Sequence, residues 1–200
     1  MSINITEKIP TQGFEKVLYR IAEILFLELT AQKATHDNIG NFQVFLERMT
    51  AYDKSEDIMI NVTTSSANYG NFTETDTQGK TDFNIEVYAP LEHTFIAADD
   101  KVKRFTLHKV VGMIRYILQS TKYNILGLPP GLIGGTYVES IQFFDDFNNQ
   151  DGANIRLATL VFSVRVCENQ ELWKGISIEN NTTQIKLCDT DLGFKLIKNT

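Results

Sequence analysis

The spacing of apolar residues changes near residue 40, and this change constrains the fold more than any other feature of the chain. Before it, apolar residues recur every three or four positions and predict an amphipathic helix near residues 12–32; they are Phe14, Val17, Leu18, Ile21, Leu25 and Leu29. After it, apolar and polar residues alternate in segments that begin at Phe42, Ile58 and Phe83. Alternation is typical of strands with one face on a core, so we expect three half-buried antiparallel strands.

A polar stretch at residues 70–80 separates the second and third of these strands. Its one large apolar residue is Phe72, so the stretch has almost nothing to bury. We therefore predict a long β-hairpin, Ile58–Ala89, whose tip projects from the body. Exposed strand edges pair readily with other chains. The expected interface with a second copy or a partner is the tip with its flanks: Asn71, Phe72, Glu74, Asp76, Gln78 and Lys80.

The second half of the chain predicts another helix and two more strands. The helix is expected near residues 98–121, and a Gly/Pro-rich connector follows at residues 126–135. The strand Tyr137–Phe144 alternates irregularly, which indicates a β-bulge. In the last strand one face carries Ala158, Leu160, Phe162, Val164 and Val166; the apolar residues of its other face, Leu157 and Val161, need cover from a helix or a neighbour.

These elements predict an α+β fold. We expect an antiparallel or mixed sheet of about four to five strands, packed against two helices, with a long projecting β-hairpin. The apolar pattern weakens after residue 168 and leaves short strand-like pairs between polar turns. The expected organisation is a domain at 1–168 followed by a C-terminal β-arm or extension at 169–200.

Charge and composition narrow the classes of function. Nineteen basic and 25 acidic residues give a net charge of −6, whereas domains that grip nucleic acid are usually basic. The one basic run lies on the predicted second helix, where a solvated face is the simplest interpretation. Its other interpretation is salt bridges to a neighbouring subunit by Lys101, Arg104 and Lys109. The longest helical apolar run, residues 24–27, is far short of the ~20 residues of a membrane span, so we expect no membrane partner.

No motif in the sequence predicts catalysis. The histidines His36, His93 and His108 have no metal-binding spacing, and two cysteines cannot form a four-ligand zinc site. The acidic residues Asp145, Asp146 and Asp151 lack the spacing of a calcium loop and are typical of a turn. We therefore expect no catalytic, cofactor or metal site and predict that the chain is not an enzyme. A small metal-dependent hydrolase that uses this acidic loop is the remaining alternative.

The order of elements resembles the α/β fold of tailed-phage tail-terminator, or tail-completion, proteins and related neck proteins. The resemblance rests on layout and strand character: the helix Gly13–Thr30, the hairpin Ile58–Ala89, the helix Lys101–Ser120, and the strand pair Tyr137–Phe144 and Ile155–Cys167. The segment after residue 168 departs from the minimal pattern of the family.

The resemblance implies a structural virion protein without cofactors. Proteins of this family form a hexameric ring on the last ring of tail-tube protein, where they stop tube growth and join the tail to the neck. The implied partners are further copies of the chain, the tail-tube protein and neck or connector proteins, and the implied location is the virion, after assembly in the host cytoplasm. DNA would pass through the ring without specific binding. A neck connector, or a tube cap of a contractile injection system, is the alternative on the same scaffold.

Overall fold

The computed structural model describes residues 9–35, 40–53, 57–71, 76–90, 106–145, 155–169, 184–186 and 195–197. Two helices, a 3₁₀ turn and seven strands lie in these ranges: α1 (Gly13–Thr35), β1 (Phe42–Leu46), β2 (Ile58–Asn71), β3 (Asp76–Pro90), α2 (Thr106–Leu118), η1 (Thr121–Tyr123), β4 (Ile133–Asp145), β5 (Ile155–Asn169), β6 (Gln184–Lys186) and β7 (Lys195–Ile197). The chain divides into two compact units, 1–170 and 171–200.

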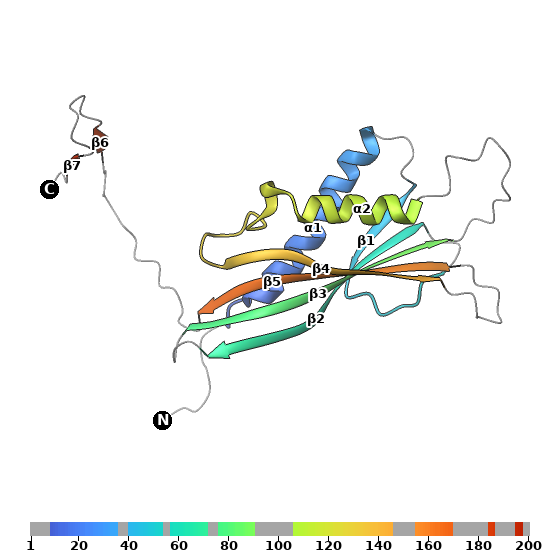
Figure 1. The fold of residues 1–200 in the computed structure, drawn as a ribbon, viewed down its shortest axis with the longest axis horizontal. Coiled ribbons are helices and arrows are strands. Elements are labelled where there is room, and N and C mark those ends of the chain that lie inside the picture. The colour runs from blue at the N-terminus through green and yellow to red at the C-terminus, as the bar shows by residue number, and fades with distance from the viewer. Residues whose placement is uncertain are drawn as a thin grey trace. The chain divides into compact units, whose positions relative to one another are not determined.

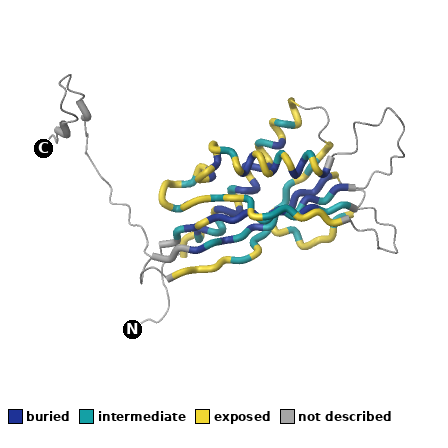
Figure 2. The backbone as a smooth tube through the Cα atoms, in the orientation of Figure 1, coloured by how far each residue is buried: buried dark blue, intermediate teal, exposed yellow. Residues whose placement is uncertain are grey.

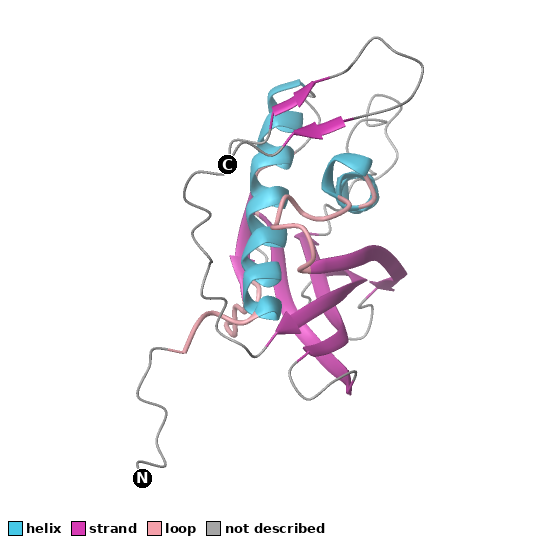
Figure 3. Cartoon of the chain, turned by 90° about the vertical axis from the view of Figure 1, so that its left-hand side faces the viewer, coloured by secondary structure: helices cyan, strands magenta, loops and turns pink. Residues whose placement is uncertain are grey.

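The first unit is one five-stranded sheet with two helices on the same face (Figures 1 and 3). The strand order is β1-β2-β3-β5-β4, in which β1 runs parallel to β2 and the remaining pairs are antiparallel. The predicted α+β class with a mixed sheet is therefore confirmed. The antiparallel direction expected for the strand at Phe42 is wrong, because alternation specifies which face a strand buries and not its direction.

The core lies between the helices and the sheet face that they cover (Figure 2). The predicted face of β5 is fully buried, and Phe162 in β5 lies directly opposite Phe83 in β3. From the helices, α1 buries Val17, Ile21 and Leu25, and α2 buries Ile114. Val17, Ile21 and Leu25 are apolar positions of the predicted stripe of the first helix, so the sequence pattern identifies this part of the core correctly.

The connector after α2 is anchored to α1 by polar contacts. Arg20 Nε donates to the carbonyl oxygen of Leu126 over 2.7 Å. Lys122 Nζ lies 2.6 Å from Glu28 Oε1, and the Tyr123 hydroxyl donates to the same oxygen. Leu126 has a φ of 54°, in the left-handed region, yet its side chain is fully buried in the core. These contacts hold residues 122–126, which precede β4, against α1.

The predicted bulge is present in β4. The register of β4 against β5 shifts between Val138 and Ser140, which places Glu139 at the extra position. A bulge breaks the strict alternation of side chains along a strand. This break explains the irregular pattern that the sequence shows from Tyr137 to Phe144.

The hairpin strands are long, and their flanks belong to the sheet. β2 pairs with β3 from Met59↔Tyr88 to Asn71↔Thr77. β3 in turn pairs with β5 along its whole length, from Pro90↔Ile155 to Asp76↔Asn169. The tip itself, 72–75, lies outside the described residues, so the projecting tip stays a prediction.

In the second unit β6 and β7 form an antiparallel pair, with Ile185 opposite Leu196. These residues belong to two of the strand-like pairs in the sequence. The predicted role of this segment as an arm stays a prediction.

Candidate functional site

The sheet has a second face, opposite α1 and α2, which we call the helix-free face. The register places on it Lys80 and Asp82 of β3, Val161 and Ser163 of β5, and Tyr137 of β4. In the described part of the chain both helices lie on the other side of the sheet (Figure 3). Polar and apolar side chains mix on this face, and such a mixture is typical of a surface that contacts water or another protein.

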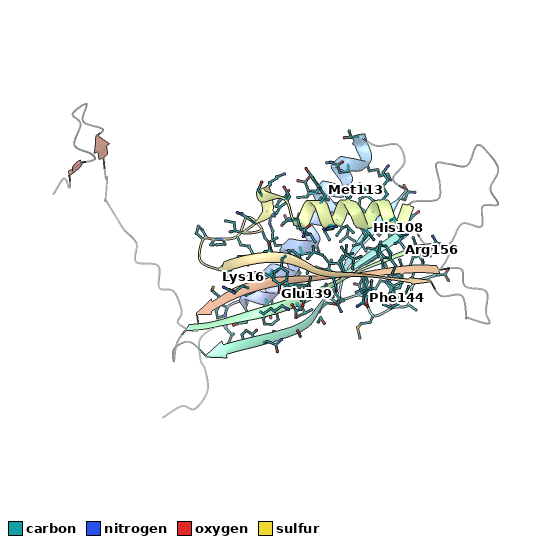
Figure 4. The ribbon with its side chains drawn as sticks, in the orientation of Figure 1. Lys16, His108, Met113, Glu139, Phe144 and Arg156 are labelled. Carbon is teal, nitrogen blue, oxygen red and sulfur yellow. The ribbon has the colours of Figure 1, made fainter. Side chains whose placement is uncertain are left out.

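A cluster of polar side chains occupies the middle of the helix-free face; we call it the serine–carboxylate cluster (Lys80, Asp82, Glu139, Ser163 and Ser66). Lys80 Nζ lies 2.7 Å from Glu139 Oε2 and 3.3 Å from Asp82 Oδ1. The Ser66 hydroxyl donates to Asp82 Oδ2 over 3.1 Å. Glu139 lies two residues after Tyr137 on the same face of β4, where it is the extra residue of the bulge (Figure 4).

Ser163 is shared between the two carboxylates. Its hydroxyl oxygen lies 2.6 Å from Asp82 Oδ1 and 2.7 Å from Glu139 Oε2, and the residue has no exposed surface. A hydroxyl has one proton, so it donates to one carboxylate at a time. The two carboxylates are therefore joined by Lys80 and by one shared hydroxyl proton, and Asp82 also accepts from Ser66.

The hydrogen bonds in the cluster favour the ionised carboxylates. Burial opposes ionisation of Asp82, but hydrogen bonds from Ser163, Lys80 and Ser66 outweigh it, so the pKa of Asp82 lies below its ordinary value. Hydrogen bonds from Lys80 and Ser163 lower the pKa of Glu139 as well. The bond to Glu139 in turn raises the pKa of Lys80. All three groups stay charged at neutral pH, and the cluster has a net charge of one negative unit.

The loop after β1 covers one end of the helix-free face. Arg48 N donates to Asn61 Oδ1 over 2.9 Å, and Asn61 Nδ2 donates back to the Arg48 carbonyl over 3.3 Å. The Tyr52 ring stacks on that of Tyr88, with 5.5 Å between centroids. As a result Met59 is only 3% exposed although it lies on the face without helices.

Apolar groups on the helix-free face are left partly exposed beside this cover. Tyr137 and Phe144 are 50% and 46% exposed, and Leu157 and Val161 are half-buried. The sequence predicted that Leu157 and Val161 would need cover from a helix or a neighbour. Neither described helix supplies that cover, since both lie on the opposite face.

Two segments at the edges of the sheet carry no charged side chain, and one of them contains a shift of register between Thr64 and Ser66. β1 occupies the outer side of β2 only as far as Val62. Beyond it, residues 63–68, the β2 edge segment, carry no charged side chain, and no other described strand pairs with their outer side. At the opposite edge, residues 140–144 of β4, the β4 edge segment, are also uncharged and follow the bulge. Most proteins protect such edges with charges, prolines or a cover.

The predicted interface residues fall into three groups. The backbones of Asn71, Asp76 and Gln78 lie in the ladder between β2 and β3, whereas Phe72 and Glu74 lie outside the described residues. Lys80 lies in the serine–carboxylate cluster instead of at a projecting tip. Its part in an interface stays a prediction.

The basic residues predicted to make salt bridges between subunits are mostly not described. Lys101 and Arg104 lie outside the described residues, and Lys109 is half-buried on α2. Sequence reasoning missed Asp82, Glu139 and Ser163. Alternation gives each of the three residues a face on its own strand, but the sequence does not show that β3, β5 and β4 are neighbours or in which register they pair.

The other titratable candidates form no cluster in the described part of the chain. His108 is exposed and packs against the Phe143 ring, with 4.5 Å between centroids, while His36 and His93 are not described. Cys167 is a reduced, half-buried thiol, and Cys188 is not described. Asp146 and Asp151 also lie outside the described residues. No group of three or more His, Cys, Asp or Glu residues among those described could hold a metal ion.

Within the described residues, no helix has the length and apolar character to cross a membrane. Comparison with known proteins adds no family: no protein-family model matches the sequence, and a search of curated proteins finds no match.

Proposed function

We propose that this chain is a structural virion protein that forms a ring, of six copies, at the head-proximal end of a phage tail. The ring ends growth of the tail tube and joins the tail to the neck. The observation that carries the proposal is the pair of uncharged edge segments at opposite sides of one sheet. A subunit that pairs head to tail through two different edges closes into a ring when the rotation between copies permits.

The helix-free face and the charge of the chain support a role in assembly. Half-exposed Tyr137 and Phe144 are the kind of aromatic side chains that become buried at protein interfaces. A net charge of −6 suits a channel for DNA, since a lumen with few cations does not hold the polyanion. In this proposal the partners are further copies of the chain, the tail-tube protein and neck proteins, and no cofactor takes part.

The serine–carboxylate cluster supports a structural role better than an enzymatic one. An activated serine needs a base that accepts its proton. Ser163 instead faces two carboxylates whose pKa values are lowered, and such groups are weak bases. Lys80, the nearest amine, has a raised pKa and stays protonated. The cluster therefore fits the task of tying β3, β4 and β5 together at the surface.

The proposal is tested with the purified full-length chain by native mass spectrometry, alone and with tail tubes. We expect a closed oligomer of uniform copy number, or a monomer that forms a ring when tubes are added. A monomer that neither assembles nor binds tubes would refute the proposal. Binding to neck proteins without binding to tubes would instead favour the alternative, a neck connector on the same scaffold.

A further inference from the structure

We infer that neighbouring copies of this chain join by antiparallel pairing of the β2 edge segment of one copy with the β4 edge segment of the next. The inference rests on the proposed ring and specifies its interface. It moves the main contact away from the hairpin tip to residues 63–68 and 140–144.

Strand direction favours a head-to-tail contact between these two edges. β3 is antiparallel to β2, β5 is antiparallel to β3, and β4 is antiparallel to β5. The two edge strands of one sheet therefore run in opposite directions. When a second copy is placed beside the first in the same orientation, its β4 lies antiparallel to β2, and the sheet continues across the interface.

The backbone of β2 directs hydrogen-bonding groups outward at Ala67. Ile58 N donates to the Asn41 carbonyl, and the Val62 carbonyl accepts from Glu47 N, so these even-numbered residues face β1. Neighbouring residues in a strand direct their backbone groups to opposite sides. The register shift between Thr64 and Ser66 then reverses the alternation, so that Ala67 faces away from β3.

In β4 the backbone groups of Ile141 and Phe143 point away from β5, to the outer side of the sheet. Cys167 N donates to the Leu132 carbonyl, so the odd-numbered residues of β5 face β4. Their partners in the β4 edge segment are Ser140, Gln142 and Phe144, which therefore face β5. The residues between these partners direct their backbone groups to the outer side of the sheet.

The position of β1 selects the register. With Ala67 opposite Phe143, the end of β4 stops short of Val62, whose outer side β1 already occupies. A shift that brings Ile141 opposite Ala67 moves the end of β4 two residues towards β1. In the selected register the small Ala67 meets the half-exposed Phe143 on the helix side, and Asn68 meets Gln142 on the helix-free face. No charged pair is buried.

This pairing also staggers successive copies along the strands. Within one copy Asn68 of β2 lies level with Arg165 of β5, whereas Gln142 of β4 lies level with Thr159. Joining the two therefore displaces each copy along the strand direction. A constant stagger between strands is the geometric condition for a sheet that closes on itself.

Cross-linking between differently labelled copies tests the inference. Asn68→Cys and Gln142→Cys are prepared as separate proteins in a Cys167→Ser, Cys188→Ser background, then mixed and oxidised. Directly opposed residues in an antiparallel pair have Cβ atoms ~5 Å apart, which permits a disulfide. We expect a linked dimer in the mixture and none in either protein alone. Thr159→Cys mixed with Asn68→Cys is the control, since Thr159 lies on a central strand and should not link.

Linking of Asn68→Cys to itself would replace the head-to-tail contact with a two-fold contact between β2 edges. Rings of the unmodified chain without any link in the mixture would overturn the inference and leave the ring function intact. A chain that stays monomeric even on tail tubes would overturn both.

A second pair of variants tests the backbone contact itself. Ala67→Pro removes an N–H group that faces outward, so the fold should be retained, whereas Ala67→Ser keeps the group and serves as the matched control. The loss of one hydrogen bond between copies, together with the steric clash of the pyrrolidine ring of proline, should weaken association about tenfold or more. Unchanged assembly of a folded Ala67→Pro protein, with folding checked by circular dichroism, would contradict the inference.

Discussion

At the scale of single residues, Ser163 has one hydroxyl proton for two carboxylates and no exposed surface. Ser163→Ala removes the shared donor, which leaves Glu139 with Lys80 and leaves Asp82 with Lys80 and Ser66. Loss of a buried hydrogen bond to a charged group should lower the free energy of unfolding by about 1–3 kcal/mol at pH 7. Chemical denaturation of the variant and the unmodified chain measures this difference.

The pH dependence of that loss follows from the direction of the pKa shifts. Asp82 and Glu139 have lowered pKa values in the folded state, so their stabilising contribution is present above the ordinary carboxyl pKa and disappears as the pH falls. The Ser163→Ala variant should therefore differ most from the unmodified chain at neutral pH and least near pH 3. An equal loss of stability at both pH values would show that the hydroxyl does not act through the carboxylates.

Tyr123 provides a second residue-scale test, away from the sheet. Its hydroxyl donates to Glu28, whose pKa is lowered by hydrogen bonds from Lys122 and Tyr123. Tyr123→Phe should reduce the free energy of unfolding by about 1 kcal/mol. Tyr116→Phe is the matched control, because Tyr116 is 79% exposed, and it should change stability by less than about 0.5 kcal/mol. Equal effects in thermal unfolding would contradict the proposed anchoring of the connector.

At the scale of elements, substitution of two phenylalanines should have different effects: one should lower the stability of the fold and the other should weaken association. Phe162 is fully buried in β5, and Phe162→Ala should cost about 3–5 kcal/mol, enough to unfold many small domains. Phe144 in the β4 edge segment is 46% exposed, and Phe144→Ala should leave the stability of the monomer nearly unchanged while it weakens association. Thermal unfolding and sedimentation of both variants check this pair. A large loss of monomer stability in Phe144→Ala would show that the edge belongs to the core.

The positions of the helices and strands are predictable from the sequence, whereas the direction and pairing of the strands are not. Apolar periodicity locates α1 and the buried face of β5, because burial on one side leaves a regular trace along the chain. It gives no strand direction, which is why the parallel pairing of β1 escaped prediction. The polar hairpin tip also led to the prediction of a projecting hairpin, whereas β3, its second strand, pairs with β2 on one side and with β5 on the other. The charged residues Lys80, Asp82 and Glu86 of β3 face the helix-free side, and Asp82 accepts hydrogen bonds from Ser66 on β2 and from Ser163 on β5.

The candidate site was less predictable for a related reason. Lys80 was selected for its place near the hairpin tip, whereas its contacts are Asp82 and Glu139. Asp82, Glu139 and Ser163 come from three different strands, and only the order and register of these strands bring the three side chains together. The edge segments are equally hard to predict from the sequence, because a strand forms an edge only when no other strand pairs with its outer side.

At the scale of the whole molecule, the proposed ring requires two different sheet edges that pair with each other. A head-to-tail contact either closes into a ring or continues as a filament, and the rotation between copies decides which. The acidic net charge affects what passes through such a ring, not whether it forms.

Electron microscopy of tail tubes incubated with the full-length chain tests this account most directly. The account predicts a ring of fixed copy number on one end of each tube, with the sheets of adjacent copies joined edge to edge. Tubes whose ends stay bare, while the chain remains a folded monomer in the same sample, would contradict it.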